Sequence, residues 1–146
     1  MKNLIKKLDK NLVIIGSKYE GDILKIDVKS RCKKAVCPCC GQESHSIQSR
    51  YVRPIKDLPM QDYKVILNVY VRNFYCRNKK CERKMFAEQF DFYESYSRMT
   101  TRLKNKIIEV SKGMSARASK EVVNESMAKT SDDTILRLIK KNNQNR

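Results

Sequence analysis

Two cysteine pairs decide how this chain folds. The first lies in Cys37-Pro38-Cys39-Cys40-Gly41, and the second in Cys76-Arg77-Asn78-Lys79-Lys80-Cys81. In each stretch two cysteines bracket a short turn, and the proline and the glycine suit the entry and the exit of the first one. Four thiolates at about 2.3 Å from one ion form the closed tetrahedral shell of a structural zinc site. We therefore predict structural Zn²⁺ bound by Cys37, Cys40, Cys76 and Cys81.

Two disulfides, or unpaired buried thiols, are the alternatives for these four cysteines. Disulfides belong to oxidising compartments, and no secretory signal precedes the pairs, so the sequence favours zinc. Two cysteines remain. Cys39 must point away from an ion that its neighbours hold, and Cys32 stands among cations. A nucleophile at Cys32 would need a histidine base, and the one histidine is His45. We expect Cys32 and Cys39 to be free thiols and His45 to lie outside the metal shell.

The charge balance indicates a polyanionic partner. The 146 residues contain 32 Lys and Arg against 16 Asp and Glu, which gives a net charge of +16. Such an excess favours nucleic acid over a membrane surface as the partner. No apolar run approaches the roughly 20 residues of a membrane-spanning helix. Reduced cysteines and the lack of a targeting segment predict a cytoplasmic protein. The length allows one medium domain or two small ones.

Residues 1–97 are predicted to form a helix, a hairpin and a zinc ribbon. The pattern predicts an amphipathic helix over residues 3–10 and a hairpin of strands 11–15 and 23–29. A strand over residues 45–55 should end at Pro54 and a turn at residues 57–59. Period-two alternation makes residues 63–75 the clearest strand. The last two strands lead to the cysteine pairs, which predicts a small sheet held at one end by zinc.

Cations gather around the predicted ribbon. A charged run is most often a solvated surface, but we expect about half of these side chains to contact phosphate. They are Arg50, Arg53, Lys56, Arg72, Arg77, Lys79, Lys80, Arg83 and Lys84. Five aromatic residues follow within residues 86–96. They could stack on unpaired bases, but we favour a segment that joins two modules.

Residues 98–146 are predicted to form three short helices. Thr100 or Thr101, Ser115 and Ser131 are the expected N-caps. A helix-turn-helix module, with its third helix in the major groove, fits this pattern, and a plain three-helix bundle is the alternative. Asp132 and Asp133 would repel phosphate at the start of that helix. The predicted fold class is α+β, a zinc-ribbon β domain followed by a helix-turn-helix module.

An ordered series of residues resembles a known family. The series is Cys37-Pro-x-Cys40-Gly41, Arg53 with Asp57-Leu-Pro59, Arg72-x-Phe-x-Cys76, Cys81-x-x-Lys84-x-Phe86-x-Glu88, and Ser131-x-x-Thr134-x-Leu136-Arg137. It is similar to the N-terminal region of bacterial insertion-sequence transposases of the IS-L-three type. There the ribbon and helix-turn-helix precede a catalytic DDE domain. The resemblance implies binding to the double-stranded terminal inverted repeats, with a homodimer in a synaptic complex.

The candidate DNA contacts come from the ribbon and from the third helix. They are Arg53, Arg72, Lys84, Ser131, Thr134, Arg137, Lys140 and Lys141. The chain ends after Gln144-Asn145-Arg146, and its other carboxylates are scattered, whereas two-metal phosphoryl transfer needs clustered carboxylates. We therefore expect DNA binding without catalysis. A stand-alone zinc-ribbon regulator or assembly factor that binds RNA or protein is the alternative.

Overall fold

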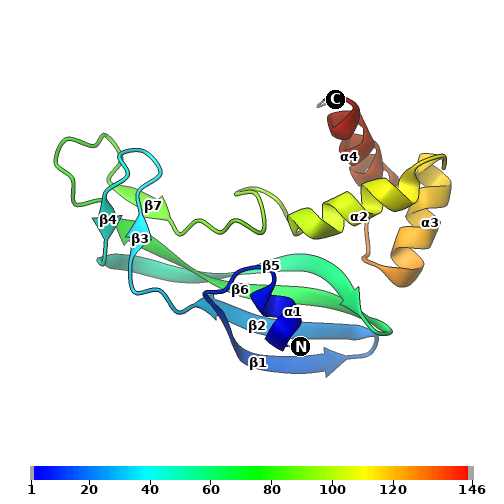
Figure 1. Ribbon diagram of the computed structural model, residues 1–146, viewed down its shortest axis with the longest axis horizontal. Coiled ribbons are helices and arrows are strands. Elements are labelled where there is room, and N and C mark those ends of the chain that lie inside the picture. The colour runs from blue at the N-terminus through cyan, green and yellow to red at the C-terminus, as the bar shows by residue number, and fades with distance from the viewer. Residues whose placement is uncertain (1, 145–146) are drawn as a thin grey trace.

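The computed structural model describes residues 2–144 (Figure 1). A sheet occupies the first two thirds of the chain, and three helices follow it, so the α+β class is confirmed. The cysteine pairs and the helices lie at opposite ends of the long axis (Figure 1). The elements are α1 Lys2–Lys6, β1 Leu12–Glu20, β2 Ile23–Ser30, β3 Ala35–Val36, β4 Glu43–Ser44, β5 Ile47–Met60, β6 Tyr63–Tyr75, β7 Met85–Ala87, α2 Thr101–Ser111, α3 Ala116–Ser126 and α4 Asp132–Gln144.

Strand β6 is the centre of a five-stranded sheet of order β1-β2-β6-β5, to which β7 adds by pairing with β6. Its bounds agree with the predicted strand, and its alternate residues Val65, Leu67, Val69 and Val71 are buried. Strand β5 pairs with it antiparallel, while β2 pairs with it parallel from Ile23↔Lys64 to Lys29↔Tyr70. The N-terminal hairpin is thus part of the same sheet as the ribbon strands, which the sequence did not predict.

Strand β5 is longer than predicted. The expected turn at residues 57–59 is wrong, because the strand continues through Pro54 and Pro59 to Met60. Proline is tolerated there because β5 is an edge strand, whose outer side needs no ladder hydrogen bond. The register shifts between Asp57 and Met60, and the chain turns instead at Gln61, which has a positive φ of 54°. Two other bounds also differ from prediction, since α1 is shorter and β1 is longer.

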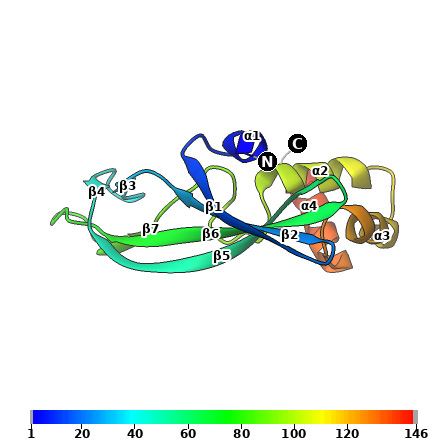
Figure 2. The same cartoon turned by 90° about the horizontal axis from the view of Figure 1, so that it is seen from below.

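One face of the sheet is covered by α1 and by residues 88–99, here called the strap (Figure 2). Ile5 of α1 and the strap residues Phe90, Phe92 and Tyr93 belong to the hydrophobic core of the sheet. Four of the five aromatic residues of this region are therefore buried, as expected of a segment that joins two modules. Tyr96 is the exception, since it is 98% exposed.

The three C-terminal helices start at the predicted caps. The hydroxyls of Thr100, Ser115 and Ser131 accept the backbone N–H three residues later, at 3.2, 3.1 and 3.2 Å. The helices enclose a second core that includes Leu103, Ile107, Val123, Met127 and Ile135. Leu136, which was expected in the buried stripe of α4, is instead 41% exposed. Ile135 is buried, and the next residue lies about 100° further round the helix.

The helices are attached to the outer edge of β5. The N–H of Lys56 donates to the carbonyl of Arg98, and the N–H of Thr100 donates to the carbonyl of Lys56, both at 2.9 Å. Beside this bridge, the fully buried Asp57 accepts from the Thr100 hydroxyl and from Arg102 Nε, each at 2.8 Å. The start of α2 is thereby fixed to the sheet.

Candidate metal centre and nucleic-acid interface

The four cysteines predicted as ligands lie together. The Sγ atoms of Cys37, Cys40, Cys76 and Cys81 are all within 4.8 Å of one another. The Sγ atoms of Cys37 and Cys81 are 3.9 Å apart, and those of Cys40 and Cys76 are 3.6 Å apart. A tetrahedron with metal–sulfur distances of about 2.3 Å has an edge of about 3.8 Å. The geometry and the four-thiol donor set therefore fit Zn²⁺.

Each cysteine pair is positioned by a turn at the end of strands. In the first turn, the N–H of Gly41 donates to the carbonyl of Cys37 at 2.9 Å, and Gly41 has a positive φ of 76°. In the second, Cys76 follows β6 directly, and its N–H donates to the carbonyl of Lys84 at 2.8 Å. Phe74 and Phe86 stack beneath the sulfurs with ring centroids 5.8 Å apart. Residues 35–47 and 74–87 are called the zinc end below.

The thiols compete for negative charge. The backbone N–H of Gln42 and the side chain of Asn78 lower the pKa of Cys40 to about 6. At Cys81 the backbone N–H of Arg83 lowers the pKa, but desolvation and the thiols of the neighbouring cysteines outweigh it and raise that pKa to about 12. A divalent cation would stabilise all four thiolates at once, and the resulting closed shell would leave no position for a substrate.

The other metal-ligand candidates lie outside this group. Cys39 is exposed, although it stands between two of the ligands, and His45 is exposed as well. Among residues 2–144, no other group of His, Cys, Asp and Glu side chains could hold a metal. The two expectations, a shell of four sulfurs and an outside position for Cys39 and His45, agree with the structure.

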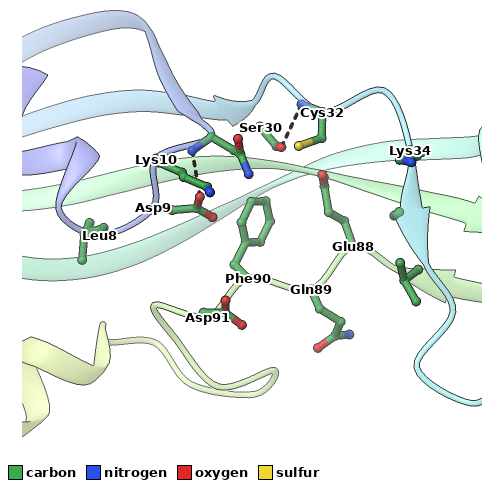
Figure 3. Close-up of a pocket in the computed structure, with 13 residues that line it drawn as sticks. Leu8, Asp9, Lys10, Ser30, Cys32, Lys34, Glu88, Gln89, Phe90 and Asp91 are labelled. Atoms are coloured by element: carbon green, nitrogen blue, oxygen red, sulfur yellow. Dashed lines mark hydrogen bonds between the residues drawn. The ribbon is translucent and has the colours of Figure 1, made fainter. Parts of the chain in front are cut away.

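Cys32 lies beside a separate cavity of about 470 Å³ (Figure 3). Its N–H donates to the Ser30 hydroxyl at 3.1 Å, and the lining includes charges of both signs from Lys10, Glu88 and Asp91. No histidine is among the lining residues, so the cavity lacks the base that a cysteine nucleophile would use. A free thiol remains the interpretation for Cys32.

Residues 33–81 match the profile of a protein family described as the zinc-finger of transposase IS204/IS1001/IS1096/IS1165. The match contains all four clustered cysteines and ends at the last of them. This segment is a transposase zinc ribbon. The prediction of structural Zn²⁺ is thereby confirmed by two observations, the cluster of four thiols and the family match.

A transposase of Bordetella parapertussis is similar to a larger part of the chain. The "Transposase for insertion sequence element IS1001" is 31% identical over 83 residues, which make up 57% of this chain and 20% of that transposase. The aligned part thus spans about a fifth of the length of this relative. No solved structure is significantly similar to the chain. Among residues 2–144, every helix is too short or too polar to cross a membrane.

Two of the predicted DNA contacts on the ribbon side are engaged within the protein. The guanidinium of Arg72 binds both carboxylate oxygens of Glu88, with Nε 3.2 Å and Nη2 2.5 Å away, and both side chains are largely buried. The guanidinium of Arg53 donates to the carbonyls of Ser95 and Ser97. Lys84, in contrast, is exposed in the zinc end. Phosphate contacts by Arg53, Arg72 and Lys84 stay predictions.

The predicted contacts on α4 lie together at its exposed surface. Arg137 and Lys140 are exposed, and the guanidinium of Arg137 reaches back to the Asp133 carbonyl and the Thr134 hydroxyl at 3.4 and 3.5 Å. Lys141 pairs with Glu94 of the strap at 3.3 Å. Ser131 caps the helix, and Asp133 is exposed, while the side chain of Asp132 lies outside the described part of the chain.

The sequence did not identify a basic cleft next to α4. A cavity of about 690 Å³ lies between the strap, β5 and the start of α4. Four cations from separate elements line it, namely Lys56, Arg98, Lys104 and Arg137. Lys56 and Arg137 were singled out as cations in the sequence, but no local pattern indicates that the four side chains meet, because they are brought together by the bridge between the strap and β5.

Proposed function

We propose that this chain is the DNA-recognition part of an insertion-sequence transposase and binds the terminal inverted repeats of its element. The observation that carries the proposal is the transposase zinc ribbon of residues 33–81. The net charge of +16 supports a nucleic-acid partner, since neutralising DNA phosphates requires an excess of Lys and Arg. The chain of Bordetella parapertussis that shares this region is named as a transposase.

We propose further that α3 and α4 form a helix-turn-helix in which α4 reads the major groove. Residues 127–131 connect the two helices, and the side-chain amide of Asn124 exchanges two hydrogen bonds with the backbone of Thr130. The connection is therefore held in one geometry. Helix α4 packs Ile135 into the helical core and presents Arg137 and Lys140 on its exposed side. Basic side chains on an exposed helix suit a major-groove reader.

The proposed function divides the chain at about residue 97. Residues 1–97 would supply the ribbon and its sequence-independent attraction to phosphate, and residues 98–146 would supply base recognition. Two separate hydrophobic cores, one in the sheet and one among the helices, support this division. Lys84 is the ribbon cation best placed for phosphate, because Arg53 and Arg72 use their guanidinium groups within the protein.

The division of roles predicts different effects for Arg137→Ala and Lys84→Ala. If Arg137 contacts a base edge, its loss should weaken specific binding by about 1–3 kcal/mol and relax sequence preference. The loss of Lys84 should weaken binding to every sequence alike and reduce the salt slope by about one. Salt titrations of both variants, on a duplex selected from a random pool and on its scrambled counterpart, measure these effects.

The wild-type protein on the same two duplexes is the control for these titrations. The proposal for α4 would be wrong if Arg137→Ala weakened both duplexes equally while Lys84→Ala changed the sequence preference. In that case the ribbon, and not the helix, would read the bases.

We also propose that this region binds DNA without cutting it. Phosphoryl transfer by two metal ions needs carboxylates held close together. Within residues 2–144 the one candidate metal group consists of four cysteines, which suits a structural ion. With magnesium or manganese present, the purified protein should neither nick nor join labelled repeat DNA. Reproducible cleavage that co-purifies with the chain, and is lost on Cys37→Ser or Arg137→Ala substitution, would overturn this proposal.

A further inference from the structure

The basic cleft beside α4 carries excess positive charge. Its lining contains Lys56, Arg98, Lys104 and Arg137 and no acidic side chain. Lys56 Nζ donates to the carbonyl of Lys129, a neutral group, and Lys104 has a long ion pair of 3.8 Å with Glu94. Among the described residues, no carboxylate forms an ion pair with Lys56 or Arg98. The cleft is therefore suited to an anion.

The environment of Lys56 supports the same conclusion. Partial burial lowers the pKa of Lys56, and the positive charges of Arg98 and Lys129 lower it further. A bound phosphate would reverse the electrostatic part of this effect, because an anion within a few ångströms stabilises an ammonium group. The Ser131 and Thr134 hydroxyls at the start of α4 also line the cleft and add neutral polar groups.

Tyr96 stands at the same cleft with its ring in solvent. It lines the cavity and is 98% exposed, whereas Phe90, Phe92 and Tyr93 of the same strap are buried. Its backbone is nevertheless held, because one guanidinium, that of Arg53, binds the carbonyls of both neighbours, Ser95 and Ser97. The exposed ring is thus presented from a braced segment.

A ring of this kind has a specific use next to a phosphate site. Aromatic side chains stack on the faces of nucleic-acid bases, and every base has such a face. In a continuous duplex each face is already covered by the neighbouring base pair. A side chain at the edge of the duplex can therefore stack only where a base is unpaired, as at a bulge or at the junction between duplex and single strand.

We propose that the cleft binds a phosphate of the DNA backbone and that Tyr96 stacks on an unpaired base next to that phosphate. This inference rests on the proposed function, since it takes DNA as the ligand of the neighbouring helix α4. It adds a second kind of recognition, because α4 would read paired bases while the strap would detect a break in pairing. The protein would then bind a junction or bulge more tightly than a continuous duplex.

The test uses the whole chain with zinc bound and two fluorescent probes. One is a continuous duplex that contains 2-aminopurine in a base pair, and the other is the same duplex with the 2-aminopurine in a bulge. Wild-type protein should bind the bulged probe about tenfold more tightly and quench its fluorescence, as stacking does. Tyr96→Ala should remove both the preference and the quenching, and Tyr96→Phe should keep them.

Two control variants separate the ring from the charge. Tyr51→Ala removes another exposed tyrosine from the sheet, away from the cleft, and should change neither measurement. Arg98→Gln should weaken binding to both probes, because it removes a cation from the phosphate site. Tyr96 is fully exposed, so its replacement should leave the fold unchanged.

The outcomes distinguish this inference from the proposed function. Wild-type protein that binds both probes equally, or a Tyr96→Ala variant that keeps the preference, would overturn the inference and leave DNA recognition intact. Wild-type protein that binds neither probe would overturn both. Displacement of the bulged probe by polyglutamate at the same concentration as by DNA would show that the cleft takes an acidic peptide, and the inference would be wrong.

Discussion

Replacing Cys37 by serine should abolish zinc binding and unfold the zinc end. Cys37 is the most deeply buried of the four ligands, and it packs with Phe74 and Phe86 in a small separate core. Binding free energies at structural zinc sites are on the order of 10–16 kcal/mol and act as folding free energy. The variant should lose bound zinc, measured by metal analysis, and should lose amide protection at residues 35–47 and 74–87, measured by hydrogen exchange.

The matched control is Cys39→Ser, two residues away. Cys39 is exposed and lies outside the sulfur cluster, so this variant should retain one zinc ion per chain. The larger core, formed by the sheet, α1 and the strap, contains none of the four ligands. We therefore expect β1, β2 and the adjoining part of β6 to stay protected in Cys37→Ser. Equal zinc loss from both variants would contradict the assignment of the shell.

Replacing Asp57 by alanine should destabilise the protein by about 3 kcal/mol, the lower end of the range for breaking a buried ion pair. Asp57 is fully buried and binds the guanidinium of Arg102 through both oxygens, while also accepting from the Thr100 hydroxyl. Without the carboxylate, Arg102 and Thr100 lose their partner in the interior. The guanidinium is partly exposed, which limits the cost. Urea unfolding measures the effect.

The control for this prediction is Asp62→Ala, an exposed carboxylate in the β5–β6 turn, which should change the free energy of unfolding by less than about 0.5 kcal/mol. A second comparison is Asp57→Ala combined with Arg102→Leu, which removes both charges of the pair. If the ion pair accounts for the loss, the double variant should be more stable than Asp57→Ala alone. Equal stability of Asp57→Ala and wild type would contradict the described attachment of α2.

The features that the sequence predicted are those with local signals. The period of residues 63–75 defined β6, the cysteine spacing defined the metal group, and the hydroxyl residues Thr100, Ser115 and Ser131 marked the helix starts. Each of these depends on residues close in the chain. The α+β class and the order of sheet before helices followed from them.

The features that the sequence missed depend on distant partners. The parallel pairing of β2 with β6 joins segments that are separated by the first cysteine pair, and no local pattern specifies it. Arg72 was expected to contact phosphate, but the structure places Glu88, 16 positions later in the chain, against its guanidinium. The basic cleft was missed for the same reason, because Lys56 and Arg98 meet only after the strap pairs with the edge of β5.

The continuous course of β5 and β6 gives the protein a built-in length. The zinc end and the helices are not connected by a loose tether, since the two longest strands run between them and the strap and Asp57 fix the helices to the sheet (Figure 1). If both ends contact one DNA molecule, the sheet sets the interval between the two contacted segments. Extra base pairs inserted between those segments would have to be absorbed by bending or twisting the DNA, because the protein holds the interval constant.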